Sequence, residues 1–314
     1  MNITILNIPN YYASYYLLGF STNGSLKYKA DPRFLKYNNK PVLIFEYNNK
    51  IGVIDNDDPV KIIQELYELA SIYFVTNKLI ASECYQQQKV QPLFPHYPVN
   101  ISGLYLKLFG MQLFRFLKPM EVARQLYIYY RRPIYKKIKY KSIKDNYVFF
   151  SSNIWKKEPE TNAIRAAFIR YCKQDSRIKF EGGFVGRSDG NNFDFENEIN
   201  IVKYSPKVFS KLSAKSLVVL NNPAVCDAVS WRLAEYLNQG LFVLSFPFKI
   251  TLPIALEHEN NMHFIEDVKE FKSVFDSVFS TPVYHEKVSE NGKLYFDTYC
   301  TPEAQANYII QTLT

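Results

Sequence analysis

One stretch of the sequence, residues 222–245, spaces charged and aromatic side chains in a way that suits ligand binding. The pattern predicts a strand end, a loop, a helix that stops at Gly240, and a second strand. Asp227 stands at the expected start of the helix, where a carboxylate caps free N–H groups and is stabilised by the helix dipole. Glu235 lies about two turns further on. Trp231 lies between them, and the three side chains are predicted to share one helix face.

Phosphate groups need cations or N–H donors. The candidates in this half of the chain are Arg187, Arg232 and Lys203. Arg187 follows a predicted strand, and its alternative role is that of a solvated loop arginine. Helix N-termini in the same region would add backbone N–H groups.

Histidine is a natural general base near neutral pH. His96 lies in the proline-bounded loop 94–98, which is expected to face a cleft, so it is a candidate base or acceptor contact. A packed or solvated loop histidine is the alternative. None of the histidines has zinc-ligand spacing; they are His96, His258, His263 and His285.

Metal and disulfide chemistry is not expected. The segment Asp55-Asn-Asp57 matches the D-x-D form of a metal–diphosphate motif, but it follows a strand and precedes Pro59, where turn and capping chemistry explains it. The cysteines form no C-x-x-C pair, which argues against zinc, iron–sulfur clusters and a disulfide framework. They are Cys84, Cys172, Cys226 and Cys300. A reducing cytoplasm is the simplest compartment.

Positive charge is concentrated in residues 114–144, which carry ten basic residues and a single acid, Glu121. This segment has a net charge of +9 and the rest of the chain about −1, against a total of +8. Tyrosines and phenylalanines lie among the cations. The combination suits an anionic membrane surface, a solvated linker or single-stranded nucleic acid. The residues predicted to face a membrane are Arg131, Arg132, Lys136, Lys137 and Lys139.

The elements that must position these residues follow from apolar periodicity and helix signals. In the first half we expect strands at 3–8, 41–46, 51–55, 72–75 and 90–93, a short helix at 11–20, and a helix starting at Pro59 with Val60 on its apolar side. An amphipathic helix is expected over 110–130. In the second half we expect strands at 147–151, 178–185, 216–220, 241–245 and 263–265, alternating with helices at 158–174, 205–212, 227–238, 268–279 and 302–313.

This alternation predicts an α/β fold with parallel sheets. The expected organisation is an N-terminal Rossmann-like domain (1–113), a basic interdomain segment (114–146) and a second Rossmann-like domain (147–314) whose last helix packs back on the first. Such domains bind ligands in the cleft between them, at the carboxyl ends of the strands. The chain is 47% hydrophobic and 22% charged, which fits a soluble protein. No apolar run reaches about 18 residues and the N-terminus lacks signal-peptide features.

Residues 222–245 also resemble the GT-B glycosyltransferases, many of which carry P-S-x-x-E-x7-E followed by Gly and a strand. The corresponding residues are Pro223 to Asp227, Glu235 and Gly240. Ser230-Trp-Arg-Leu-Ala-Glu-Tyr-Leu237 and Leu252-Pro-Ile-Ala-Leu-Glu-His258 are similar to bacterial surface-polysaccharide glycosyltransferases, as is Phe150 to Trp155 with Arg165 in the next helix. The resemblance covers residues 147–280. It implies that Glu235 binds the donor ribose and Asp227 the donor sugar, with Ser230, Trp231, Arg232 and His258 nearby.

We therefore predict a glycosyltransferase that moves a sugar from a nucleotide-sugar donor to a lipid-linked or surface-polysaccharide acceptor. It would need no metal or other cofactor and would lie at the cytoplasmic face of the cell membrane. Inverting chemistry needs a carboxylate or histidine base, and retaining chemistry does not. The alternative is a non-catalytic protein that binds nucleic acid or another polyanion through residues 114–144. Protease, kinase and ATPase motifs are absent from the sequence.

Overall fold

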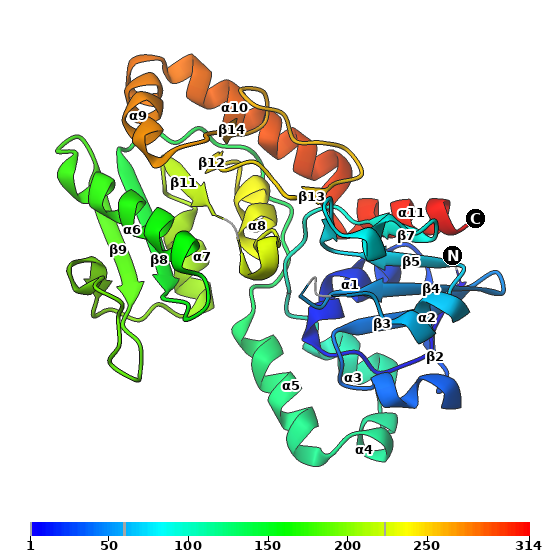
Figure 1. Ribbon diagram of the computed structural model, residues 1–314. Coiled ribbons are helices and arrows are strands. Elements are labelled where there is room, and N and C mark those ends of the chain that lie inside the picture. Colours follow the sequence, from blue (N-terminus) through cyan, green and yellow to red (C-terminus); the bar gives the residue numbers. More distant parts are fainter. Residues whose placement is uncertain (1, 59–60, 223) are drawn as a thin grey trace.

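The computed structural model describes residues 2–58, 61–222 and 224–314. These residues form two α/β units that lie side by side and are joined by the helices α3 to α5 and by the long C-terminal helices (Figure 1). The two predicted α/β units are therefore present. Pro59, Val60 and Pro223, which carry parts of the sequence predictions, lie outside the described residues.

The first unit is built on one six-stranded sheet in the order β2-β1-β3-β4-β5-β7. Its pairs are parallel except those of β3, which runs antiparallel to β1 and β4. Helices α1 (Ser14–Thr22) and α2 (Gln64–Leu69) belong to this unit. The strands are β1 (Asn2–Ile5), β2 (Ser25–Tyr28), β3 (Val42–Tyr47), β4 (Lys50–Asp55), β5 (Ile72–Val75) and β7 (Val90–Pro92).

A two-residue turn, Asn48-Asn49, joins the antiparallel strands β3 and β4. Asn48 and Asn49 both have positive φ (49° and 61°), the conformation that a two-residue turn between twisted strands requires and that asparagine tolerates. The prediction for the following helix is wrong in its start. Helix α2 begins at Gln64 after an extended Ile63, and the buried Leu66 anchors it to the sheet.

The single helix predicted over 110–130 is two helices, α4 (Gln112–Phe116) and α5 (Pro119–Arg131). Helix α3 (Ser102–Phe109) precedes them. Lys118 is extended (φ −69°, ψ 144°), because the proline ring disfavours helical geometry in the residue before it. Pro119 then starts α5 at the position where its missing N–H costs nothing.

The second unit contains the parallel strands predicted for it. The sheets run β10-β9-β8 and β11-β12-β14, and every pair is parallel. Leu217 N donates to Tyr147 O (2.7 Å), so the start of β11 lies beside the start of β8. The strands are β8 (Tyr147–Asn153), β9 (Lys179–Val185), β10 (Ile199–Asn200), β11 (Val218–Asn221), β12 (Phe242–Ser245) and β14 (His263–Phe264). Strand order therefore reverses between β8 and β11, as in a doubly wound fold.

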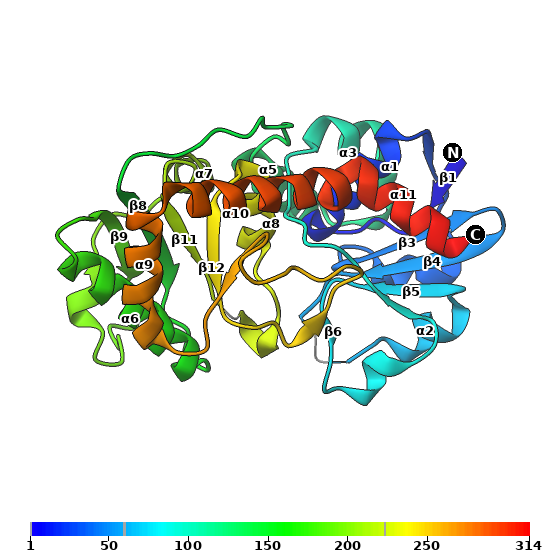
Figure 2. The ribbon, with the colours of Figure 1, turned by 90° about the horizontal axis from the view of Figure 1, so that it is seen from above.

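Helices flank these strands. They are α6 (Pro159–Gln174), α7 (Pro206–Ser213), α8 (Trp231–Gln239), α9 (Phe271–Ser280) and α10 (Pro282–Tyr295). Gly240 ends α8 in the left-handed conformation (φ 67°), as predicted. Helix α10 was not predicted. It continues through a π-helical turn, Phe296–Cys300, into α11 (Pro302–Leu313), and Figure 2 shows this run of helices passing from the second unit to the first.

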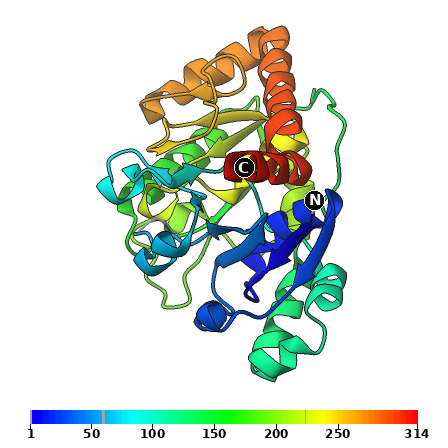
Figure 3. The same ribbon diagram turned by 90° about the vertical axis from the view of Figure 1, so that its right-hand side faces the viewer.

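The C-terminal helix packs on the first unit, against α1 (Figure 3). A Cβ at Gly19 of α1 would lie 2.0 Å from the Pro302 carbonyl oxygen, so the close approach requires glycine there. Tyr15 donates to Cys300 O (2.7 Å), and Lys50 binds the carbonyl oxygens of the last two residues. One buried apolar cluster contains side chains from both units, including Tyr15, Tyr236 and Ile309.

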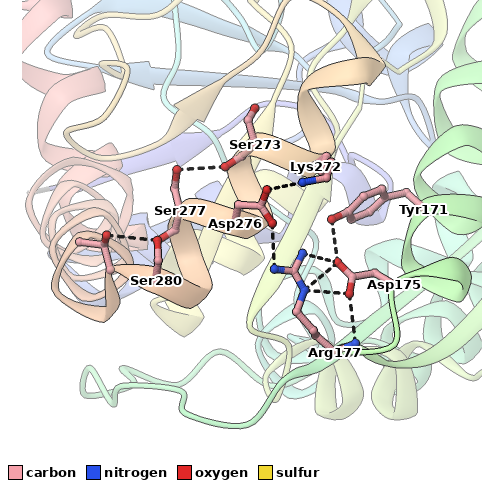
Figure 4. A network of polar contacts seen from close by, with 9 residues as sticks. Tyr171, Asp175, Arg177, Lys272, Ser273, Asp276, Ser277 and Ser280 are labelled. Atoms are coloured by element: carbon pink, nitrogen blue, oxygen red, sulfur yellow. Dashed lines mark hydrogen bonds and ion pairs between the residues drawn. The ribbon is translucent and has the colours of Figure 1, made fainter.

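A polar network joins α6 to α9 on the surface of the second unit (Figure 4). Arg177 binds Asp175 (2.6 Å) and Asp276 (2.8 Å), and Tyr171 donates to Asp175 (2.8 Å). These bonds hold the turn after α6 against the outer helix. They lie away from the carboxyl ends of the strands and have a structural role.

Candidate functional site

The carboxyl ends of both sheets point toward the junction of the units. In the first unit β4 ends at Asp55, and Asn77 and His96 follow β5 and β7. Val229 N, from the segment after β11, donates to Asn77 Oδ1 (2.9 Å). β6 (Lys78–Leu79) pairs antiparallel with β13 (Ile250–Thr251) from the second unit. Doubly wound folds bind ligands at the carboxyl ends of their strands, so this junction is the candidate site.

Arg165 of α6 is the most unusual residue at the junction. Its side chain is 3% exposed, lies over the Trp155 ring (3.7 Å) and donates from Nη1 to Asn153 O (3.2 Å) at the end of β8. Among the described residues its Nε has no partner and no carboxylate lies within ion-pair distance. Burial, and then repulsion from Arg232, lowers the pKa of Arg165 to about 9, and the charge of Glu158 opposes the fall. A buried cation without a carboxylate in direct contact is costly unless a ligand supplies an anion.

Arg232 and Glu235 of α8 lie beside it. The Arg232 guanidinium packs over the Phe209 ring of α7 (4.4 Å). Burial raises the pKa of Glu235, and a hydrogen bond with Ser210 and the charges of Arg232 and Arg132 oppose the rise. The Glu235 side chain is half-buried near two arginines, where it can accept hydrogen bonds from neutral hydroxyl groups of a ligand.

Ser230 and Trp231 begin the same helix. The Ser230 hydroxyl caps it by accepting from Arg232 N (3.3 Å). Trp231 packs edge-on against Tyr12 of the first unit (ring centroids 4.9 Å). Arg132 lies over the Trp231 ring (5.4 Å) and over Tyr11 (5.2 Å). The prediction that Arg132 faces a membrane is wrong, because aromatic rings at the junction bind its guanidinium.

Asp227 does not start the helix, so the predicted common face with Glu235 is wrong. It lies in the preceding 3₁₀ turn, Val225–Asp227, with φ 60°, next to Cys226 with φ 55°. Two adjacent left-handed residues cannot enter a right-handed helix, and the helix begins four residues later. The Asp227 carboxylate is exposed, binds Lys249 Nζ (2.8 Å) and lines a cavity of about 30 Å³ with Asn221 and Ser245.

His96 faces the junction as expected, but it is enclosed. Its side chain is 5% exposed, its ring lies 5.0 Å from that of Tyr16, and burial lowers its pKa to about 3. Nε2 has no partner among the described residues, and the ring lines a cavity of about 20 Å³ with Asn77 and Ser230. A histidine of such low basicity is a poor general base, so this geometry does not support that role.

The D-x-D segment is engaged in local structure. Asp55 accepts from the Tyr73 hydroxyl and from Asp57 N (3.1 Å), and burial raises its pKa to about 6. Asn56 is buried, and neither atom of its amide has a partner among the described residues. Within the same part of the chain, no three His, Cys, Asp or Glu side chains gather in a way that could hold a metal ion.

Of three predicted donor-binding residues, Arg187 lies near Arg165. It donates from Nη1 to Ile154 O (3.4 Å), between the two residues that Arg165 contacts, and it is paired with Asp189 in the loop after β9. Lys203 is exposed in the loop before α7. His258 accepts from Phe264 N (3.0 Å) and lines an open depression of about 590 Å³ near the ends of β12 and β14. These contacts do not bring Lys203 or His258 to the arginines.

The structure adds residues that were missed as site residues from the sequence. Arg165, Asn77 and Asn56 carry unpaired or junction-facing polar groups, but each stands in an unremarkable local sequence. Arg165 had only one signal, its place within the segment that resembles glycosyltransferases. Its lack of a carboxylate partner depends on tertiary packing and could not be read from the chain.

No family model matches the chain, and no curated protein matches it. Solved structures with similar folds are glycosyltransferases. The chain shares 11% identity with HepE from Anabaena in complex with UDP (TM-score 0.49; 83% of this chain and 71% of that one). It shares 10% with a glycosyltransferase from Rickettsia africae (TM-score 0.49; 96% and 79%). It shares 15% with the C-terminal domain of a group 1 family glycosyltransferase from Francisella tularensis (TM-score 0.35; 51% and 88%).

Proposed function

We propose that the protein is a glycosyltransferase that transfers a sugar from a nucleotide-sugar donor, with no metal required. The observation that carries the proposal is the buried Arg165, which forms no ion pair in the described residues and lies near Arg232, where strand order reverses between β8 and β11. This is the position at which doubly wound folds bind nucleotides.

The donor diphosphate would supply the missing negative charge. Arg165 and Arg232 repel one another, as the lowered pKa of Arg165 indicates, and a diphosphate between them would remove that repulsion. Guanidinium groups bind phosphate oxygens through paired N–H donors, which also fixes orientation. In this proposal the two arginines do the work that a metal ion does in other transferases.

Glu235 would bind the ribose. Its side chain is half-buried on α8 near Arg232, so a nucleotide whose phosphates lie on the arginines would bring its ribose close. Neutral hydroxyl groups donate well to a carboxylate that has lost its water. The resemblance to the E-x7-E motif assigns the same role to this residue.

In the transfer, an acceptor hydroxyl attacks C1 of the donor sugar, the C1–O bond to the diphosphate breaks, and a new C1–O bond forms. The hydroxyl proton leaves to a base or to the departing diphosphate. We propose that Asp227 contacts the sugar, because it lines the cavity at the ends of β11 and β12. Neutral His96 would help to exclude water at the junction.

The test is a thermal unfolding screen against UDP, GDP, CMP, TDP and ADP with EDTA present. One nucleotide should raise the midpoint on the order of 5 °C at a hundred times its Kd. Glu235→Gln should reduce that shift at least threefold, whereas Arg124→Gln, at an exposed position of α5, should leave it unchanged. If no nucleotide shifts the midpoint but an oligonucleotide does so in a salt-sensitive way, the polyanion-binding alternative replaces the transferase.

We also propose that the acceptor is a lipid-linked or surface-polysaccharide glycan and that the protein lies peripherally on the inner face of the cell membrane. Arg131, Lys136, Lys137 and Lys139 are exposed on α5 and the segment after it, which supports contact with an anionic surface. In the described residues, no helix is both long and apolar enough to cross a bilayer. Vesicle binding at low and high salt tests this contact.

A further inference from the structure

A groove lies outside the junction, between the end of β2 with the segment after it and helix α4. Its volume is about 440 Å³. Tyr28, Lys29 and Leu35 line one wall, and Gln112, Arg115 and Phe116 of α4 line the other. Neither the sequence motifs nor the proposed transfer reaction uses this groove.

The groove holds two cations, Arg115 and Lys29, that form no ion pair among the described residues. Both side chains are exposed. The charge of Lys29 helps to lower the pKa of Asp31, but Nε and Nη2 of Arg33 already donate to that carboxylate. Two unpaired cations on opposite walls of one groove favour an anionic ligand.

A hydroxyl group adds a directional donor. The oxygen of Tyr28 is buried and has no hydrogen-bond partner among the described residues. Burial raises the pKa of Tyr28 to about 12, and the charge of Arg115 opposes the rise, so the hydroxyl keeps its proton at neutral pH. A buried donor without a partner costs free energy that an acceptor oxygen in the groove would recover.

Large exposed apolar side chains lie on and next to helix α4, which forms the second wall of the groove. Met111, just before α4, is 79% exposed, and Phe114 of α4 is 57% exposed. Met120, in the first turn of α5, is 78% exposed. Leu106 of α3 is also exposed. Figures 1 and 3 both show α4 and α5 standing out from the sheet of the first unit. Apolar tips beside free cations are typical of a surface that enters the interfacial region of a bilayer.

We propose that this groove binds the phosphate of an anionic membrane lipid, with Arg115, Lys29 and the Tyr28 hydroxyl on its oxygens and with Met111 and Phe114 among the acyl chains. The inference rests on the membrane contact proposed above and deepens it, because it replaces a diffuse charge attraction by one built site. The exposed apolar side chains on and next to α4 favour a lipid over a soluble phosphate, which would gain nothing from them.

The experiment measures flotation with vesicles of neutral phosphatidylcholine alone and with 30 mole percent phosphatidylglycerol, a composition chosen on the order of natural anionic content. Wild type should bind only the anionic vesicles. Lys29→Gln with Arg115→Gln should weaken that binding about tenfold or more. Lys269→Gln with Lys287→Gln, which removes the same charge from exposed sites of the second unit, should change it less than about threefold.

Tyr28→Phe tests the groove itself, since it deletes only the unpartnered hydroxyl and keeps the ring that packs on Phe109 (5.0 Å). Tyr28→Phe should weaken vesicle binding about threefold. Met111→Ser combined with Phe114→Ser should weaken it about threefold or more. The proposal would be overturned by equal losses of binding in the two double variants, Lys29→Gln with Arg115→Gln and Lys269→Gln with Lys287→Gln, or by binding of neutral vesicles. It would also be overturned if 10 mM inorganic phosphate at constant ionic strength displaced more than about half of the vesicle binding, or if the protein preferred an oligonucleotide. Nucleotide-induced thermal shifts, measured on the same preparations, report separately on the transferase.

Discussion

At the scale of single residues, two buried titratable groups at the junction, Arg165 and His96, differ in their charge. Arg165 keeps a charge that no ion pair in the described chain balances, whereas His96 is neutral. A ligand anion would balance the charge of Arg165, whereas the unpartnered Nε2 of His96 requires only a neutral hydrogen-bonding group. This difference explains why the arginine, and not the histidine expected from the sequence, is the centre of the proposed site.

His96 should make the fold sensitive to acid. Its folded pKa, about 3, lies below the ordinary value near 6.5, so the unfolded chain binds more protons between these values. Stability is therefore present above pH 6.5 and falls as the pH drops, by up to about 1.4 kcal/mol per unit. Urea unfolding at pH 7.5 and pH 5.0 should show a loss about 2 kcal/mol larger in wild type than in His96→Gln. Equal losses in both proteins would contradict the burial of a neutral ring.

At the scale of elements, most strands and helices of the second unit could be predicted, because each has an apolar run or a clear cap. Ser205 before Pro206 predicted the start of α7, and Gly240 predicted the end of α8. The start of α8 could not be predicted, because the left-handed turn at Cys226 and Asp227 has no glycine to signal it. Helix α10 was missed because it depends on contacts with α8 and β12.

The network between α6 and α9 gives an element-scale prediction. Arg177 lowers the pKa of Asp175 and contributes to the lowered pKa of Asp276, so the bonds stabilise the fold above the unfolded values near 4 and lose effect as the pH falls below them. Because solvent screens Arg177 and Asp276, whose side chains are 42% and 41% exposed, Arg177→Gln should lower the melting temperature at pH 7 by less than about 3 °C. The deficit should shrink at pH 3. A larger melting-temperature deficit at pH 3 than at pH 7 would contradict a stabilising role for these ion pairs.

At the scale of the whole molecule, the two units are held together across the proposed site. The β6–β13 pair and the bond from Val229 N to Asn77 join them, and the cavities beside these contacts are about 30 and 20 Å³. A larger open depression of about 590 Å³ adjoins β13 on the side of the second unit. Small-molecule sites usually measure about 300–1,000 Å³. Because the cavities that contain Asp227 and His96 are much smaller than this, we propose that the units separate to admit a nucleotide sugar and close around it. The sequence predicted two facing units but gave no sign of this strand pair, which forms between residues far apart in the chain.

A disulfide across the pair tests that separation. Lys78 and Thr251 are register partners, so Lys78→Cys with Thr251→Cys, in a Cys84→Ser, Cys226→Ser background, should crosslink the units. The oxidised protein should bind nucleotide at least tenfold more slowly than the reduced one, in a stopped-flow measurement. Equal association rates with a complete crosslink would show that the site opens without separation of these strands.

The most direct test of the central claim is Arg165→Met, measured for both nucleotide affinity and stability without nucleotide. A methionine fills similar space without the buried charge. We expect affinity for the nucleotide to fall at least thirtyfold while the free energy of unfolding stays within about 1 kcal/mol of wild type or rises, because the desolvation cost is removed along with the contact to Trp155. Unchanged affinity, or a loss of several kcal/mol without nucleotide, would mean that Arg165 supports the fold and is not the anion site.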